Sequence, residues 1–109
     1  MFLSARKVSE LSAQDIEFIK EAAGALARCG ERLEKALRKL ESAERTLDLV
    51  AEHGPPFSRE EATEKYKEAW KGAEKARYLY IVQREAIGFR NHKFPDRIYP
   101  LPPLRSLSA

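Results

Sequence analysis

The chain has 109 residues, of which 43% are hydrophobic and 34% are charged, and its formal net charge is +3. This length predicts one domain, and this hydrophobic content excludes an intrinsically disordered chain. Because 20 basic residues are mixed with 17 acidic ones, the strong basicity of a dedicated nucleic-acid binder is absent.

The first predicted element is a long helix over about residues 13–52. Ser12 precedes it as an N-cap, and Asp15 in the first turn favours the positive end of the helix dipole. Gly54 and the two prolines after it stop the helix. A large aliphatic residue recurs at every seventh position, and a column of smaller residues lies three positions further on. The large column is Ile19, Leu26, Leu33, Leu40 and Leu47, and the small column is Ala22, Cys29, Ala36, Ala43 and Val50.

Gly30 raises the alternative of a break in this helix, which would give a three-helix bundle. A glycine inside a helix costs about 1 kcal/mol relative to alanine. The seven-residue spacing from Leu26 to Leu33 nevertheless continues across Gly30 without a phase slip, and no turn-forming cluster flanks the glycine. We therefore predict one continuous helix, in which Gly30 leaves room for a close helix neighbour.

The second predicted helix covers about residues 59–90 and starts at a capping box formed by Ser58 and Glu61. It again carries a small column beside a larger one, and small side chains let helix axes approach closely. The short connection between the two helices is typical of antiparallel neighbours, so a helical hairpin is expected. The small column is Ala62, Ala69 and Ala76, and the larger column is Tyr66, Ala73, Tyr80 and Ile87.

After Gly88 the sequence changes character, and residues 95–109 are predicted to form an extended proline-rich tail on a helical domain of residues 1–94. Three prolines within four residues favour a polyproline II conformation. Pro100, Pro103 and Arg105 also show the Pro-x-x-Pro-x-Arg spacing of ligands for SH3-type grooves. We interpret the tail as a strap across its own chain or a partner subunit, with docking to an external protein as the alternative.

The predicted hairpin is expected to self-associate. A hairpin about 60 Å long does not match a compact chain of this length, whose radius of gyration would be about 13 Å. Residues 78–82 are apolar on every side of the second helix, and one neighbouring helix cannot cover them all. We therefore predict an all-α homodimer, in which two hairpins form a four-helix bundle. Its interface is assigned to apolar positions of both helices: Ile19, Leu26, Leu33, Leu40, Leu47, Tyr78, Ile81 and Val82.

No residue spacing in the chain is typical of a catalytic, metal or cofactor site. His53 and His92 have no carboxylate or cysteine at ligand spacing, and Cys29, the only cysteine, is expected to be a buried structural thiol. The chain lacks an apolar run of membrane-spanning length or of the signal-peptide type. We therefore expect a soluble cytoplasmic protein that is not an enzyme, holds no metal or cofactor, and does not contact a membrane.

The basic and aromatic C-terminal third is where a binding function is expected, because six basic residues there are matched by only two acidic ones. The first hypothesis is an interaction or scaffold module that binds itself and an unidentified protein. The alternative is a nucleic-acid-binding module, in which Arg84, Arg90, Lys93 and Arg97 contact phosphates and aromatic rings stack on bases. The candidate partner-binding residues are Arg84, Arg90, Lys93, Arg97, Tyr99, Pro100, Pro103 and Arg105.

Overall fold

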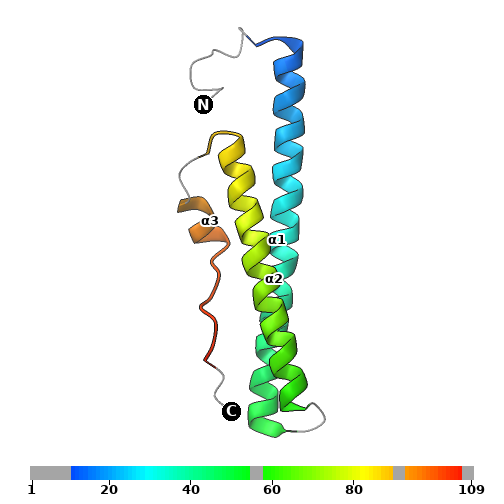
Figure 1. The fold of residues 1–109 in the computed structure, drawn as a ribbon, viewed down its shortest axis with the longest axis vertical. Helices are drawn as coiled ribbons and strands as arrows, with labels where there is room; N and C mark the ends of the chain where they lie inside the picture. The colour runs from blue at the N-terminus through cyan, green and yellow to red at the C-terminus, as the bar shows by residue number, and fades with distance from the viewer. Residues whose placement is uncertain (1–10, 55–57, 90–92, 107–109) are drawn as a thin grey trace.

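A computed structural model describes residues 11–54, 58–89 and 93–106. Within these ranges the chain forms the helices α1 (Ala13–His53), α2 (Arg59–Ala86) and α3 (Lys93–Ile98), and no strand. α1 and α2 pack against each other as an antiparallel hairpin, and the segment from α3 onward runs back along it toward the connecting loop (Figure 1). The molecule measures 63 × 20 × 16 Å and has a radius of gyration of 19.1 Å. The predicted elongated helical hairpin is therefore confirmed.

Local hydrogen bonds set both ends of α1. Ser12 Oγ accepts a bond from the Asp15 amide at 3.1 Å, and Asp15 Oδ2 accepts one from the Ser12 amide at 3.0 Å, which completes a capping box. At the other end Gly54 has a φ of 67° and its amide donates to the Val50 carbonyl at 2.9 Å. α1 passes through Gly30 without interruption, so the alternative with a break there is wrong.

α2 ends earlier than predicted, at Ala86 rather than near residue 90. Its start is as expected, because Ser58 Oγ accepts a hydrogen bond from the Glu61 amide at 3.1 Å. At its end Gly88 adopts a φ of 101°, and the next amide donates to the Arg84 carbonyl at 2.9 Å. A left-handed glycine closes the last turn of a helix and turns the chain away, which is the physical reason for the earlier end.

The prediction of a wholly extended tail is wrong at its beginning, where residues 93–98 form helix α3. Pro95 lies in the first turn of α3, where its missing amide proton costs no hydrogen bond, and its carbonyl accepts one from Tyr99 at 2.8 Å. α3 spans the predicted boundary between residues 94 and 95. Residues 100–106 form neither helix nor strand and extend along the hairpin, as predicted (Figure 1).

The core lies between α1 and α2, and the large column of α1 runs through its centre. Leu33, Leu40 and Leu47 are 0%, 1% and 8% exposed. α2 alternates small and large residues against them, so the two surfaces interdigitate. Burying one leucine contributes about 1.5–3 kcal/mol, so this column supplies much of the stability of the hairpin. The buried positions of α2 are Ala62, Tyr66, Ala73, Tyr80 and Arg84.

Gly30 is buried at the point where α1 passes the ring of Tyr80 on α2. A Cβ atom at this position would lie 3.4 Å from Tyr80 Cε1 and 3.9 Å from the Tyr99 hydroxyl. The Tyr80 and Tyr99 rings meet edge to face, with their centroids 5.4 Å apart. The close neighbour expected at Gly30 is thus the ring of Tyr80, and a Cβ atom here would make ordinary van der Waals contact with it.

Candidate functional site

The predicted interface residues separate into a buried group and a partly exposed group. Three of them are buried between the two helices of one chain: Leu33, Leu40 and Leu47. The other five lie toward the end of the hairpin far from the connecting loop: Ile19, Leu26, Tyr78, Ile81 and Val82. Tyr78 and Val82 are the most open of these, with 66% and 40% exposure. In this conformation the buried leucines offer no surface to a partner.

The tail lies against one side of the hairpin, where two aromatic side chains of α2 bind its main chain. Trp70 Nε1 donates a hydrogen bond to the Pro102 carbonyl at 2.8 Å. The Tyr66 hydroxyl accepts one from the Arg105 amide at 2.8 Å. Leu101 packs against the apolar core next to these contacts. The tail is thus a strap on its own chain in this structure.

Arg105 places its guanidinium between two acidic residues of α1 and the ring of Tyr66. Nη1 donates to Asp48 Oδ1 at 2.9 Å, and Nη2 donates to Glu44 Oε2 at 3.3 Å. The Arg105 Cζ atom lies 5.9 Å from the centre of the Tyr66 ring, within the range of a cation–π contact. The hydrogen bond to Asp48 is the main cause that raises the pKa of Arg105 above its usual value.

Tyr99 connects α3 and the tail to both long helices. Its hydroxyl donates to Glu34 Oε1 at 2.8 Å, and its carbonyl accepts a bond from Arg77 Nε at 3.2 Å. Arg77 also forms an ion pair with Asp96 on α3. The hydrogen bond to Glu34, followed by burial, raises the pKa of Tyr99 to about 12. This junction therefore favours the neutral phenol, because the adjacent carboxylate opposes a second negative charge.

We expect Tyr99 to ionise at about pH 12, well above the usual tyrosine pKa of 10.0. Its folded-state pKa is the higher one, so its stabilising contribution is complete below pH 10 and is lost as the pH rises toward 12. The measurement is the ultraviolet absorbance of tyrosinate, taken as the difference between the native chain and Tyr99→Phe. Glu34→Gln should return this difference titration toward pH 10. A native midpoint near 10 would contradict the assignment.

Arg84 is one of the predicted partner-binding residues, but it is only 9% exposed. Its Cζ atom lies 5.0 Å from the centre of the Phe89 ring and 5.4 Å from that of Phe94. Arg84 thereby joins the end of α2 to α3. The exposed members of the predicted set are Lys93, Arg97, Pro100 and Pro103, whereas Tyr99 and Arg105 are half-buried and Arg90 lies outside the described residues.

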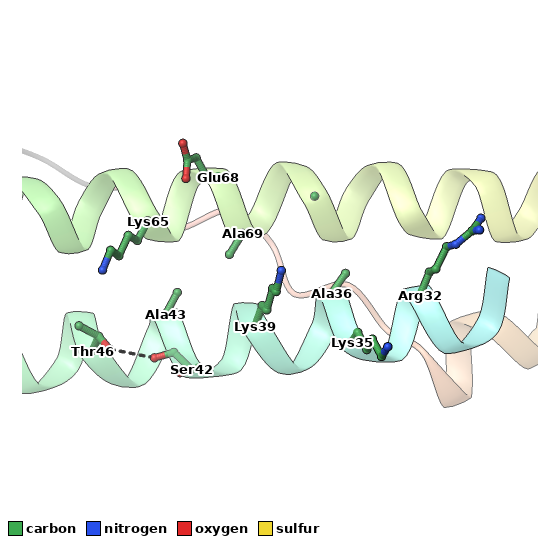
Figure 2. A pocket seen from close by; sticks show the side chains of 11 residues that line it. Arg32, Lys35, Ala36, Lys39, Ser42, Ala43, Thr46, Lys65, Glu68 and Ala69 are labelled. Carbon is green, nitrogen blue, oxygen red and sulfur yellow. Dashed lines mark hydrogen bonds between the residues drawn. The ribbon is translucent and has the colours of Figure 1, made fainter. Parts of the chain in front are cut away.

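On the other side of the hairpin from the tail, an open groove of about 630 Å³ runs between α1 and α2 (Figure 2). Lys39 of α1 and Lys65 of α2 extend toward the opposite helix, whereas Glu68 points away from the gap (Figure 2). Positively charged side chains therefore line the edges of the groove, and small side chains line the space between them. Its other lining residues are Arg32, Lys35, Ala36, Ser42, Ala43, Thr46, Ala69 and Gly72.

The groove shows where the small columns of the sequence lie. Ala36, Ala43 and Ala69 line it, and a smaller pocket that continues from it is lined by Cys29 and Ala76. Cys29 is half-buried at this surface, so its prediction as a buried core thiol is wrong. The reason is geometric: the leucines fill the space between the helix axes, and the small column is displaced to one side.

A third feature is the distal apolar surface, at the end of the hairpin far from the connecting loop. α1 has 41 residues and α2 has 28, so at 1.5 Å per residue about 20 Å of α1 extends beyond α2 (Figure 1). The exposed large apolar side chains there define this surface. They are Ile16 (42%) and Phe18 (53%) on α1, Tyr78 (66%), Leu79 (45%) and Val82 (40%) on α2, and Phe89 (50%) just after α2.

Sequence reasoning missed the residues that receive the tail. Glu44 and Asp48 stand one helical turn apart on α1, and Tyr66 and Trp70 stand one turn apart on α2. The available signal was the Pro-x-x-Pro-x-Arg motif itself, because such ligands pair with aromatic and acidic side chains. Tyr66 and Trp70 are the only two aromatic residues four positions apart in the chain, whereas several acidic pairs share that spacing, so the sequence carried a signal for the aromatic pair but could not single out Glu44 and Asp48.

Among the residues that the structure describes, no group of three or more His, Cys, Asp or Glu side chains could hold a metal ion. None of the described helices combines the length and apolar character needed to cross a membrane. Comparisons of the chain with protein-family models, with curated proteins and with solved structures found no match. The surfaces of the hairpin are therefore the basis for a functional proposal.

Proposed function

We propose that this protein is a self-associating helical interaction module, in which two hairpins join through the distal apolar surface into a four-helix assembly. The observation that carries the proposal is the set of exposed large apolar side chains on both helices in that part of the hairpin. Isolated exposed apolar residues are ordinary, whereas Tyr78, Leu79 and Val82 are exposed within two turns of α2 and form a patch that a second chain could cover.

The distal apolar surface suits pairing of identical copies better than the groove does. In a two-fold symmetric pair the same patch meets itself, so an apolar patch is complementary to its own copy. The groove would instead bring Arg32, Lys39 and Lys65 against the same residues of the partner, and juxtaposed like charges cost binding energy. The extension of α1 can lie along the end of α2 in the other copy, and the reciprocal contact then follows from symmetry.

The test is the mass of the native chain and of charged variants in light scattering. We expect twice 12.5 kDa for the native chain and 12.5 kDa for Phe18→Glu and Leu79→Glu, because each places a charge in the apolar interface. The matched control is Leu49→Glu, since Leu49 is 50% exposed near the connecting loop. A native monomer, or equal dissociation of the Leu49→Glu variant, would rule out pairing through this surface.

A further inference from the structure

We propose that the side of the hairpin beneath the tail is a binding site for proline-rich segments that carry an arginine, and that such a segment of a partner protein can replace the tail. The tail itself shows the bound state of such a ligand. The site lies on a different surface from the distal apolar patch, so this inference does not depend on the proposed self-association.

The contacts to the tail main chain are those that a proline-rich ligand requires. Proline has no amide proton and a polyproline II segment makes no internal hydrogen bonds, so its carbonyls remain available to an external donor. Trp70 Nε1 supplies such a donor to the Pro102 carbonyl at 2.8 Å. The Tyr66 hydroxyl then accepts from the amide of Arg105 at 2.8 Å, three residues further on. The two aromatic residues therefore recognise an extended backbone over a defined length.

The acidic pair on α1 adds a requirement for arginine. The two Nη groups of Arg105 donate to Asp48 and Glu44, at 2.9 Å and 3.3 Å. The planar fork of a guanidinium can reach two carboxylates at once, which the single ammonium of lysine does not match. A ligand must therefore place its arginine three residues after the carbonyl that Trp70 binds.

The structure also changes which residues of the tail form the ligand. Pro100 and Pro103, the prolines of the predicted motif, are exposed, whereas Leu101 packs against the core and Pro102 is half-buried. The site thus selects a Leu-Pro-x-x-Arg segment. Pro100 and Pro103 contribute by favouring the extended conformation before binding, which lowers the entropy cost.

The tail is a replaceable occupant because its charged contacts are accessible to solvent. The side chains of Arg105 and Asp48 are 37% and 58% exposed, and ion pairs of this kind contribute about 0–1 kcal/mol. The tail competes mainly because it is tethered, which gives it an effective concentration on the order of millimolar. A change that weakens its contacts should therefore open the site to a free peptide.

The experiment uses the full-length chain with Arg105→Glu, which sets a carboxylate against Glu44 and Asp48 and releases the tail. A fluorescent peptide with the native sequence of residues 98–106 is titrated into this variant and into the native chain. We expect the variant to bind the peptide at least about tenfold more tightly, because its own tail no longer competes. The same peptide with Arg105→Glu should bind neither chain.

A double variant, Asp48→Arg with Arg105→Glu, restores an opposite-charge pair within the chain and should close the site to the native peptide again. Circular dichroism verifies that all variants keep their helices. If a fully helical Arg105→Glu chain bound neither peptide, or bound both equally, the proposal would be overturned. A native dimer that Arg105→Glu dissolves would identify the tail of a second copy as the occupant, and would equally overturn the assignment to a partner protein.

Discussion

Replacing Leu40 with alanine is expected to lower the free energy of unfolding by about 2–5 kcal/mol, the range for truncation of a fully buried leucine. Leu40 is 1% exposed and belongs to the core cluster between α1 and α2. Its side chain fills the space between the two helices, so truncation removes apolar contacts with both of them. Thermal denaturation followed by circular dichroism should show a midpoint at least about 8 °C lower, at about 4 °C or more per kcal/mol.

The control for this prediction is Leu49→Ala on the same helix. Leu49 is 50% exposed, so its truncation removes few contacts and should change the stability by no more than about 0.5 kcal/mol. Both substitutions place alanine, the best helix former, in the interior of α1, so helix propensity does not separate them. Equal destabilisation at the two positions would show that the leucine column is not the core of the hairpin.

Replacing Tyr66 with alanine is expected to cost about 3–5 kcal/mol and also to release the tail. Tyr66 is 1% exposed and packs in the core, while its hydroxyl accepts from the Arg105 amide and its ring lies beneath the guanidinium. The stability is measured by denaturation. Release of the tail is measured by the fluorescence of Trp70, the only tryptophan, which should shift to longer wavelength once Pro102 leaves it.

Tyr66→Phe separates the two roles of this side chain. It keeps the ring in the core and removes only the acceptor of the Arg105 amide, so a loss of about 1 kcal/mol is expected. If phenylalanine were as damaging as alanine, the hydroxyl contact rather than the packing of the ring would dominate. If Trp70 emission stayed unchanged in a helical Tyr66→Ala chain, the tail would not depend on Tyr66.

The hairpin carries the three surfaces described above along one continuous helix, α1. The tail side is covered by residues 99–106, the groove side is open with lysine and arginine along its edges, and the distal end is apolar. Because α1 runs continuously past all three, their spacing does not depend on a flexible joint within that helix.

Both starts of the long helices and the end of α1 could be predicted because local chemistry sets them, whereas α2 ends at Ala86, earlier than predicted. The capping residues Ser12 and Ser58 bond to amides three positions away, and Gly54 adopts a left-handed conformation that few other residues accept. The continuity of α1 through Gly30 could likewise be predicted from the unbroken seven-residue spacing. None of these features requires knowledge of what lies beside the helix.

The partners of each surface were decided only by the tertiary structure. A heptad column shows that Leu33 and Leu40 require burial, but the pattern is the same whether their own chain or a second copy covers them. The two leucines are in fact covered by α2 of the same chain, whereas Phe18 and Tyr78 remain exposed toward the distal end. The periodicity of the sequence shows which side chains require burial, whereas only the packed chain shows which residues bury them.

The contacts of the tail could likewise not be predicted from the sequence. Its prolines predicted an extended strap, and the strap is present, but α3 and the contacts with Trp70, Glu44 and Asp48 were not predicted. These contacts join residues from 32 to 61 positions apart, and no local spacing encodes them. The amino-acid sequence by itself determined the helices and the extended tail, because capping hydrogen bonds within a few residues set the helix ends and the prolines restrict the backbone of the tail. Only the folded chain decided where the tail lies, because that depends on which aromatic and acidic groups the hairpin brings together.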